Sequence, residues 1–237
     1  MRKLTLILLI IFSITSCKND DKPTVDYNQK KDKKAIVRDT SKIVINDLPV
    51  EIDSTEYVIY VTGEPQETYY GSSYSGLGSR SSNSNSFSVI SSYNADIPGS
   101  IFNLKFQKRE SDSITSLTDQ IILITSVKFL REIFNQNKKQ YLIYTVYDDD
   151  TNGDQKINSQ DLSTLYLSKI NGKAFEKITP ENQEIIDYNI IKLQNRLYFR
   201  TIEDIDKDGK FDNEDKIHHF YIDFDNEELK PKEYDIS

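Results

Sequence analysis

Cysteine, histidine and tryptophan are scarce in this chain of 237 residues, which has one cysteine, two histidines and no tryptophan. A single cysteine excludes an internal disulfide. The histidines, His218 and His219, are adjacent in an expected strand, and neighbouring strand residues point to opposite faces, so they are not expected to share a catalytic or metal site. The chain also lacks Gly-x-Ser-x-Gly, His-Glu-x-x-His and a phosphate-binding glycine loop. We therefore expect a protein that is not an enzyme.

Basic residues are outnumbered, with 30 lysines and arginines against 38 aspartates and glutamates and a net charge of −8. An acidic chain without a basic stripe is a poor candidate for binding nucleic acid. A pair of acids that hydrolyses glycosidic bonds stays open as an alternative, because every acidic protein contains candidate pairs and here no pair stands out.

Glycine and proline are also few, at 8 and 6 residues, whereas tyrosine occurs 15 times. Short alternating apolar runs separated by turns predict an all-β fold of antiparallel strands. Residues 128–135 fit either a helical turn or a further strand. The expected strands are residues 57–61, 101–106, 121–124, 141–147, 163–167, 185–190, 197–202 and 217–222.

The first residues have the features of a secretion signal. Arg2 and Lys3 precede an apolar run, residues 4–12, that is too short to cross a membrane. The tetrad that ends in Cys17, Ile-Thr-Ser-Cys, resembles the bacterial lipobox. That resemblance implies a signal peptide over residues 1–16 and a lipid such as palmitate on Cys17; the alternative is a plain cleavable signal. Several acyl chains give stable anchoring to a membrane.

Residues 18–21, Lys-Asn-Asp-Asp, resemble the export signals of Bacteroidota surface lipoproteins, which implies an outer-membrane location and leaves open a position on the cell surface. Residues 17–42 are rich in Lys, Asp and Asn, and we expect a flexible tether there. Residues 43–237 are then one β-rich domain, large enough to bury a core.

Two acidic segments of twelve residues, 150–161 and 204–215, match the spacing of calcium-binding EF-hand loops. Oxygen ligands stand at positions 1, 3, 5, 9 and 12, and position 7 offers its backbone carbonyl. The predicted ligands are Asp150, Asn152, Asp154, Lys156, Asn158 and Asp161 in the first loop and Asp204, Asp206, Asp208, Lys210, Asp212 and Asp215 in the second. We expect Ca²⁺ in both, with Mg²⁺ as the next candidate and unoccupied acidic turns as the alternative.

The two loops are not expected to bind equally well. Gly209 stands at position 6, where the loop turns sharply, whereas Gln155 holds that position in the first loop. A non-glycine residue in the left-handed region costs about 1–2 kcal/mol. The first loop also has fewer carboxylates, so we expect the loop of residues 204–215 to bind more tightly. Ile157 and Phe211, at position 8, are expected to anchor the loops to a core.

The flanks of both loops are aromatic and β-branched, which predicts that each loop connects the two strands of a hairpin. Such a site favours structural calcium over a helix pair that opens on binding the ion. The loops also resemble those of dockerins, which dock other proteins in a calcium-dependent way. Dockerins, however, follow each loop with a helix and place their loops closer together, so this reading is an alternative.

An internal repeat relates the strand at residues 104–106 to that at 165–167, each followed by a Leu-Thr or Ile-Thr pair and further strands. A third copy begins at residue 220. Together with Asn171-Gly172, this sequence pattern resembles the repeats of TolB-type β-propellers over residues 100–225. The resemblance implies a small, open or partial propeller, because the domain has room for three or four repeats and propellers typically close with four to eight blades.

Residues 69–93 are rich in Ser, Gly, Asn and Tyr, a composition that suits either a mobile surface loop or a recognition loop for glycan or protein. The sequence as a whole favours a non-catalytic, calcium-stabilised β-domain on an outer-membrane lipoprotein, acting as a binding or scaffold module. The dockerin-like adaptor and an envelope hydrolase that acts on polysaccharide are the alternatives.

Overall fold

The computed structural model describes residues 22–28, 36, 42–65, 88–90 and 96–236. The predicted signal peptide, Cys17 and most of the tyrosine-rich segment 69–93 lie outside these residues. Within the described part of the chain, no helix is long and hydrophobic enough to cross a membrane.

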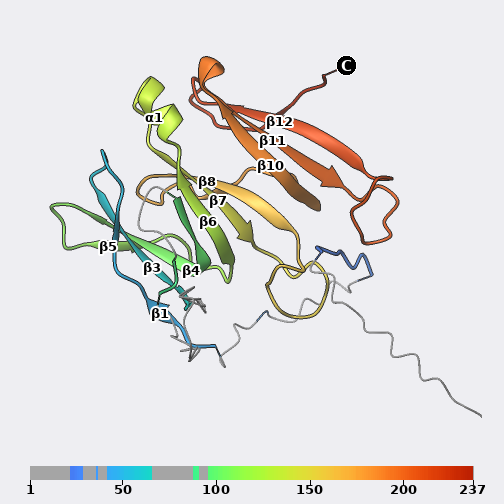
Figure 1. Ribbon diagram of the computed structural model, residues 1–237, viewed down its shortest axis with the longest axis horizontal. Coiled ribbons are helices and arrows are strands. Elements are labelled where there is room, and N and C mark those ends of the chain that lie inside the picture. The colour runs from blue at the N-terminus through green and yellow to red at the C-terminus, as the bar shows by residue number, and fades with distance from the viewer. Residues whose placement is uncertain (1–21, 29–35, 37–41, 66–87, 91–95, 237) are drawn as a thin grey trace, which may run out of the picture.

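The strands of the described residues form two open antiparallel sheets (Figure 1), which confirms the all-β prediction. The first sheet contains β1 (Ile45–Asn46), β2 (Val50–Glu51), β3 (Tyr57–Glu64), β4 (Asp96–Lys108), β5 (Ile114–Ser116), β6 (Leu123–Phe129), β7 (Tyr141–Tyr147), β8 (Ser163–Lys169) and β9 (Glu176–Lys177). The second sheet contains β10 (Gln183–Ile191), β11 (Arg196–Glu203), β12 (Lys216–Asp223) and β13 (Lys232–Glu233). A short 3₁₀ helix, η1 (Lys192–Gln194), connects β10 to β11.

The ambiguous stretch at residues 128–135 divides between the end of β6 and a short helix, α1 (Arg131–Asn137). Ile133 of this helix is fully buried in the core between the two sheets, while Phe134 packs against the core of the first sheet. Lys138 ends the helix in the left-handed conformation, with φ of 63°. The helix therefore joins two hydrophobic cores.

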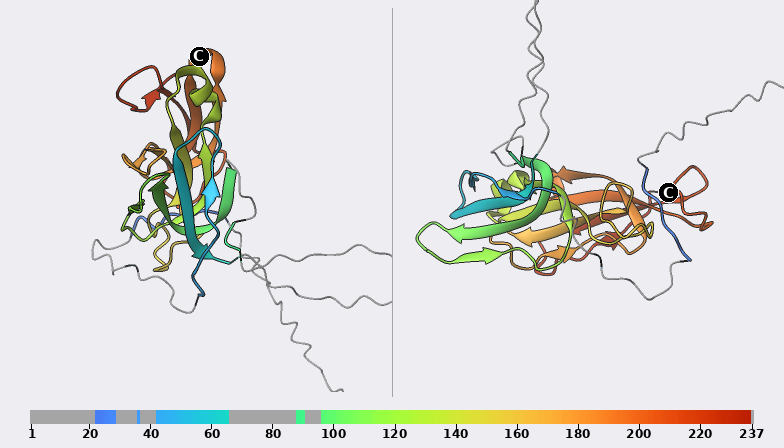
Figure 2. Two further views of the ribbon diagram at one scale, coloured as in Figure 1. Left: turned by 90° about the vertical axis from the view of Figure 1, so that its left-hand side faces the viewer. Right: turned by 90° about the horizontal axis from the view of Figure 1, so that it is seen from below.

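Strands β7 and β8 have a hydrophobic core on each face, because their alternate residues point to opposite sides of the sheet. Tyr144 and Tyr166 belong to the core enclosed by the first sheet, whereas Ile143, Leu165 and Leu167 belong to the core shared with the second sheet. Figure 2 shows the second sheet stacked at one end of the first. The second sheet contributes Leu197, Phe199, Phe220, Ile222 and the following Phe224 to this shared core.

Strand pairing in the structure recurs at the spacing of the sequence repeat. The Leu117 N–H donates to the Leu104 carbonyl at 2.9 Å, and 61 residues later the Ile178 N–H donates to the Leu165 carbonyl at 2.9 Å. The short strands β5 and β9 pair with β4 and β8 at the same offset. Strand β13 pairs with β12 in the same way. The chain thus repeats one unit of two long strands and a short one.

Candidate metal centre

Both candidate calcium loops connect adjacent antiparallel strands. The first loop lies between β7 and β8, which pair from Tyr147 with Ser163 onwards, and the second lies between β11 and β12, which pair from Glu203 with Lys216. The predicted hairpin placement of both loops is confirmed. The two ends of each loop are therefore one strand spacing apart. This places the acidic residues of the loop together at the end of the sheet.

The two loops share one set of internal hydrogen bonds, position by position. The position 1 carboxylate accepts the N–H groups of positions 4 and 6, at 2.7 and 2.8 Å in both loops. The side-chain oxygens of positions 3, 5 and 9 each accept the N–H two residues on. The position 12 carboxylate accepts the N–H groups of positions 2 and 9. This network fixes the orientation of these side chains relative to the backbone of each loop.

Each loop also places positions 4 and 6 in the left-handed region. These are Gly153 and Gln155 in the first loop, with φ of 80° and 67°, and Lys207 and Gly209 in the second, with φ of 61° and 84°. Each loop therefore has one glycine and one strained residue. The expected cost at Gln155 is present, but Lys207 carries an equivalent cost, so backbone strain does not distinguish the two loops. The difference in the number of carboxylates remains.

Three carboxylates of the second loop converge. One oxygen each from Asp204, Asp206 and Asp208 lies within 4.8 Å of the others, a spacing that allows them to hold a metal ion. Asp204 is only 3% exposed. Burial acts to raise its pKa, but hydrogen bonds from the Gly209 N–H, the Tyr27 hydroxyl and the Lys207 N–H lower the pKa below its usual value. This carboxylate is therefore held in the charged form that a cation requires.

The closing acid of the first loop has a raised pKa. Asp161 is fully buried, and burial raises its pKa to about 6 despite hydrogen bonds from the N–H groups of Asn158, Thr151 and Asn152. The charge of Asp150 acts in the same direction as burial. In the second loop the pKa of Asp206 is raised despite a hydrogen bond from the Asp208 N–H, because of desolvation and the neighbouring Asp208 and Asp204 carboxylates. A proton therefore competes with a cation in each loop.

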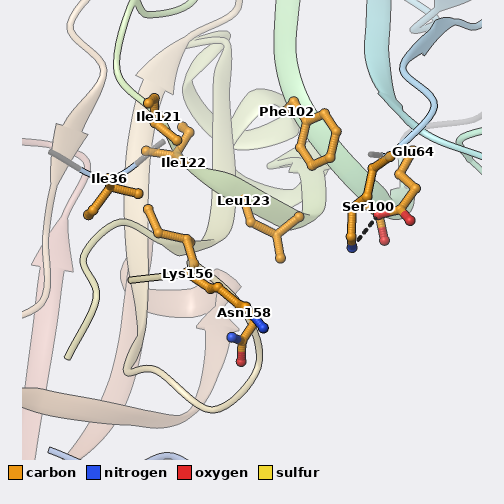
Figure 3. A pocket seen from close by; sticks show the side chains of 11 residues that line it. Ile36, Glu64, Ser100, Phe102, Ile121, Ile122, Leu123, Lys156 and Asn158 are labelled. Atoms are coloured by element: carbon orange, nitrogen blue, oxygen red, sulfur yellow. Dashed lines mark hydrogen bonds and ion pairs between the residues drawn. The ribbon is translucent and has the colours of Figure 1, made fainter. Parts of the chain in front are cut away.

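The predicted anchors at position 8 differ from expectation. Ile157 and Phe211 are half-buried and lie outside both hydrophobic cores, because the loops extend beyond the ends of the strands. Ile157 instead lines a small cavity of about 170 Å³ with Ile122, Leu123 and Phe102. Figure 3 shows this pocket beside the first loop, with Lys156 and Asn158 at its edge.

A segment before the domain, which the sequence analysis placed in the tether, lies between the two loops (Figure 1). We call residues 24–27 the strap. The Thr24 and Asp26 N–H groups donate to the Gln160 and Thr151 carbonyls of the first loop, at 2.9 and 2.8 Å. The Thr151 hydroxyl donates back to the Thr24 carbonyl at 3.0 Å. The polar composition of this stretch gave no signal of these contacts.

The strap holds the second loop through its other two residues. The Val25 N–H donates to the Gly209 carbonyl at 3.0 Å, and the Tyr27 hydroxyl donates to the Asp204 carboxylate. Burial and the nearby carboxylates raise the Tyr27 pKa. A Cβ on Gly209 would lie 2.4 Å from the Val25 carbonyl oxygen, so glycine is required there by the close approach of the strap as well as by its φ.

The residues around the loops are paired with protein groups. Asp148, just before the first loop, accepts the Tyr166 hydroxyl at 2.9 Å and forms an ion pair with Lys177 at 3.1 Å. His218 lies buried between Glu203 and Glu233, with ring nitrogens 2.8 and 2.7 Å from their carboxylates. The neighbouring His219 forms an edge-on ring contact with Tyr234, so the histidines do not share one site.

No model of a known protein family matches the chain, and no curated protein is similar to it in sequence. The two loops and the groups around them are therefore the features of this chain that indicate a function.

Proposed function

We propose that this chain is a calcium-binding protein with one ion in each of the two loops. The observation that carries the proposal is the matching network of N–H groups and aspartate or asparagine oxygens in two segments 54 residues apart. Calcium takes six to eight oxygen ligands at short range. Each loop offers carboxylates, the backbone carbonyl of an exposed lysine at position 7 and a closing acid at position 12. Two unrelated acidic turns have no reason to share every one of these bonds.

The calcium is structural on this proposal. Each loop joins two neighbouring strands, so drawing its carboxylates together without a cation costs electrostatic energy. An ion in each loop offsets that repulsion and fixes the ends of β7, β8, β11 and β12. Both loops are followed by a strand rather than a helix, which weighs against the dockerin-like adaptor.

The domain serves as a binding or scaffold module on the outer membrane, attached through lipid on Cys17, with glycan or protein as its ligand. The lipobox-like tetrad supports the anchor, and the repeated three-strand unit supports a partial, TolB-like propeller. The three units seen here are too few for the four to eight blades that close a propeller.

Equilibrium dialysis of the full chain against calcium, with metal analysis of the protein, tests the calcium proposal. We expect two ions per chain, and one ion for Asp204→Ala and for Asp150→Ala. Asp187→Ala, which removes an exposed carboxylate paired with Arg200 on the second sheet, is the control and should keep two ions. A wild-type chain without bound calcium at millimolar concentration would refute the proposal.

A further inference from the structure

The strap contacts the two loops alternately along its sequence, through three backbone N–H groups and the Tyr27 hydroxyl. Thr24 and Asp26 reach the first loop, and Val25 and Tyr27 reach the second. Four residues thus form direct hydrogen bonds with both candidate calcium loops.

The points of contact are the parts of each loop that a cation would order. In the first loop the strap holds Thr151 and Gln160, which directly follow Asp150 and precede Asp161. In the second loop it holds Asp204, the first ligand, and Gly209, whose N–H also donates to the Asp204 carboxylate. With the Lys207 and Gly209 N–H groups, the Tyr27 hydroxyl occupies three of about four lone-pair positions of that carboxylate, which leaves one for an ion.

We propose that the strap couples the two calcium sites, so that an ion in one loop raises the affinity of the other. This inference rests on the proposed function. An ion bound in one loop fixes the carbonyls and the carboxylate that the strap contacts. The strap is then held in the conformation that contacts the other loop, and that loop needs less ordering when its own ion binds. The coupling runs equally in both directions.

The test measures the calcium affinity of the second loop, followed through the amide resonance of Gly209, in the full chain. Asp154→Ala disables the first loop by removing an exposed ligand. With the native strap, we expect this change to weaken calcium binding at the second loop by about five- to tenfold, a typical size for coupling between sites. In a chain that also carries Val25→Pro and Tyr27→Phe, Asp154→Ala should leave that affinity unchanged, because proline has no N–H and phenylalanine no hydroxyl, so both bonds of the strap to the second loop are removed.

Two further variants separate the strap from general damage. Asn28→Ala removes a side chain next to the strap but keeps the hydrogen bond from its N–H to the Asp26 side chain, and it should keep the full coupling. Tyr27→Phe removes the single bond to Asp204 and should reduce the coupling without loss of fold.

The outcomes distinguish the two proposals. If calcium binds at both loops but Asp154→Ala leaves the affinity of the second loop unchanged with the native strap, the coupling is refuted and the calcium proposal stands. If the wild-type chain binds no calcium, the proposed function is refuted, and the coupling with it.

Discussion

At the scale of single residues, the two loops differ in which of their two left-handed positions is a glycine. The first loop has glycine at position 4 and glutamine at position 6, and the second has lysine at position 4 and glycine at position 6. A non-glycine residue there is strained by its Cβ. Both loops therefore keep a strained residue that a single substitution can relieve.

Gln155→Gly and Lys207→Gly should each stabilise the protein by about 1 kcal/mol, because glycine adopts the left-handed region without a steric cost. Urea unfolding in EDTA measures this gain. The matched controls are Lys156→Gly and Lys210→Gly at position 7, where glycine adds only flexibility to the unfolded chain and should destabilise slightly. Equal destabilisation by all four changes would contradict the assignment of strain.

A half-buried acid next to the first loop gives the protein a pH dependence. Glu184 accepts the Ser163 N–H and hydroxyl, each at 2.6 Å, and burial raises its pKa from 4.5 to about 7. The folded state therefore keeps a proton that the unfolded state releases, so stability falls as the pH rises from about 4.5 through 7. Asp161, whose pKa is also raised, acts in the same direction.

In EDTA, unfolding free energy should be on the order of 2 kcal/mol higher at pH 5 than at pH 8 on account of Glu184. Glu184→Gln removes the titrating group and keeps its size, so the difference between the two pH values should shrink by that amount. A variant with the same pH dependence as the wild type would show that Glu184 is not the group responsible.

At the scale of elements, the strands were largely predictable because alternating β-branched and aromatic residues mark a sheet with a distinct inner face. The stretch at residues 128–135 was not, because it ends one strand and begins a helix. The strap was missed for a physical reason: it is held by backbone N–H and carbonyl groups, which every residue carries. The hairpin position of both loops was predictable from their flanking strands, whereas the left-handed Lys207 was not.

Strand β8 should be the element least tolerant of change, since it is buried on both faces. Leu165 is fully buried in the core that joins the two sheets. Leu165→Ala should cost about 2–5 kcal/mol, as for other large-to-small changes in a core. Thermal unfolding checks this loss, with Leu193→Ala in η1 as the control because Leu193 is 96% exposed. Similar melting temperatures for both variants would contradict the packing described above.

At the scale of the whole molecule, the strap sets where the domain would sit relative to a membrane. The strap begins seven residues after Cys17, and an extended chain spans at most about 3.3–3.6 Å per residue. On the proposal that Cys17 carries the lipid, a docked strap keeps the two loops within about 25 Å of the anchor. Bound calcium would then stiffen the ends of the sheets and limit how far the domain extends from the membrane.

The most direct test of the calcium proposal is the melting temperature of the full chain in EDTA and across a calcium titration. An ion at a hundred times its dissociation constant adds about 2.7 kcal/mol per site, so we expect a rise of several degrees. Asp204→Ala should reduce that rise more than Asp150→Ala does. A melting temperature that does not change up to millimolar calcium, in the wild type as in both variants, would mean that the loops are acidic turns without an ion.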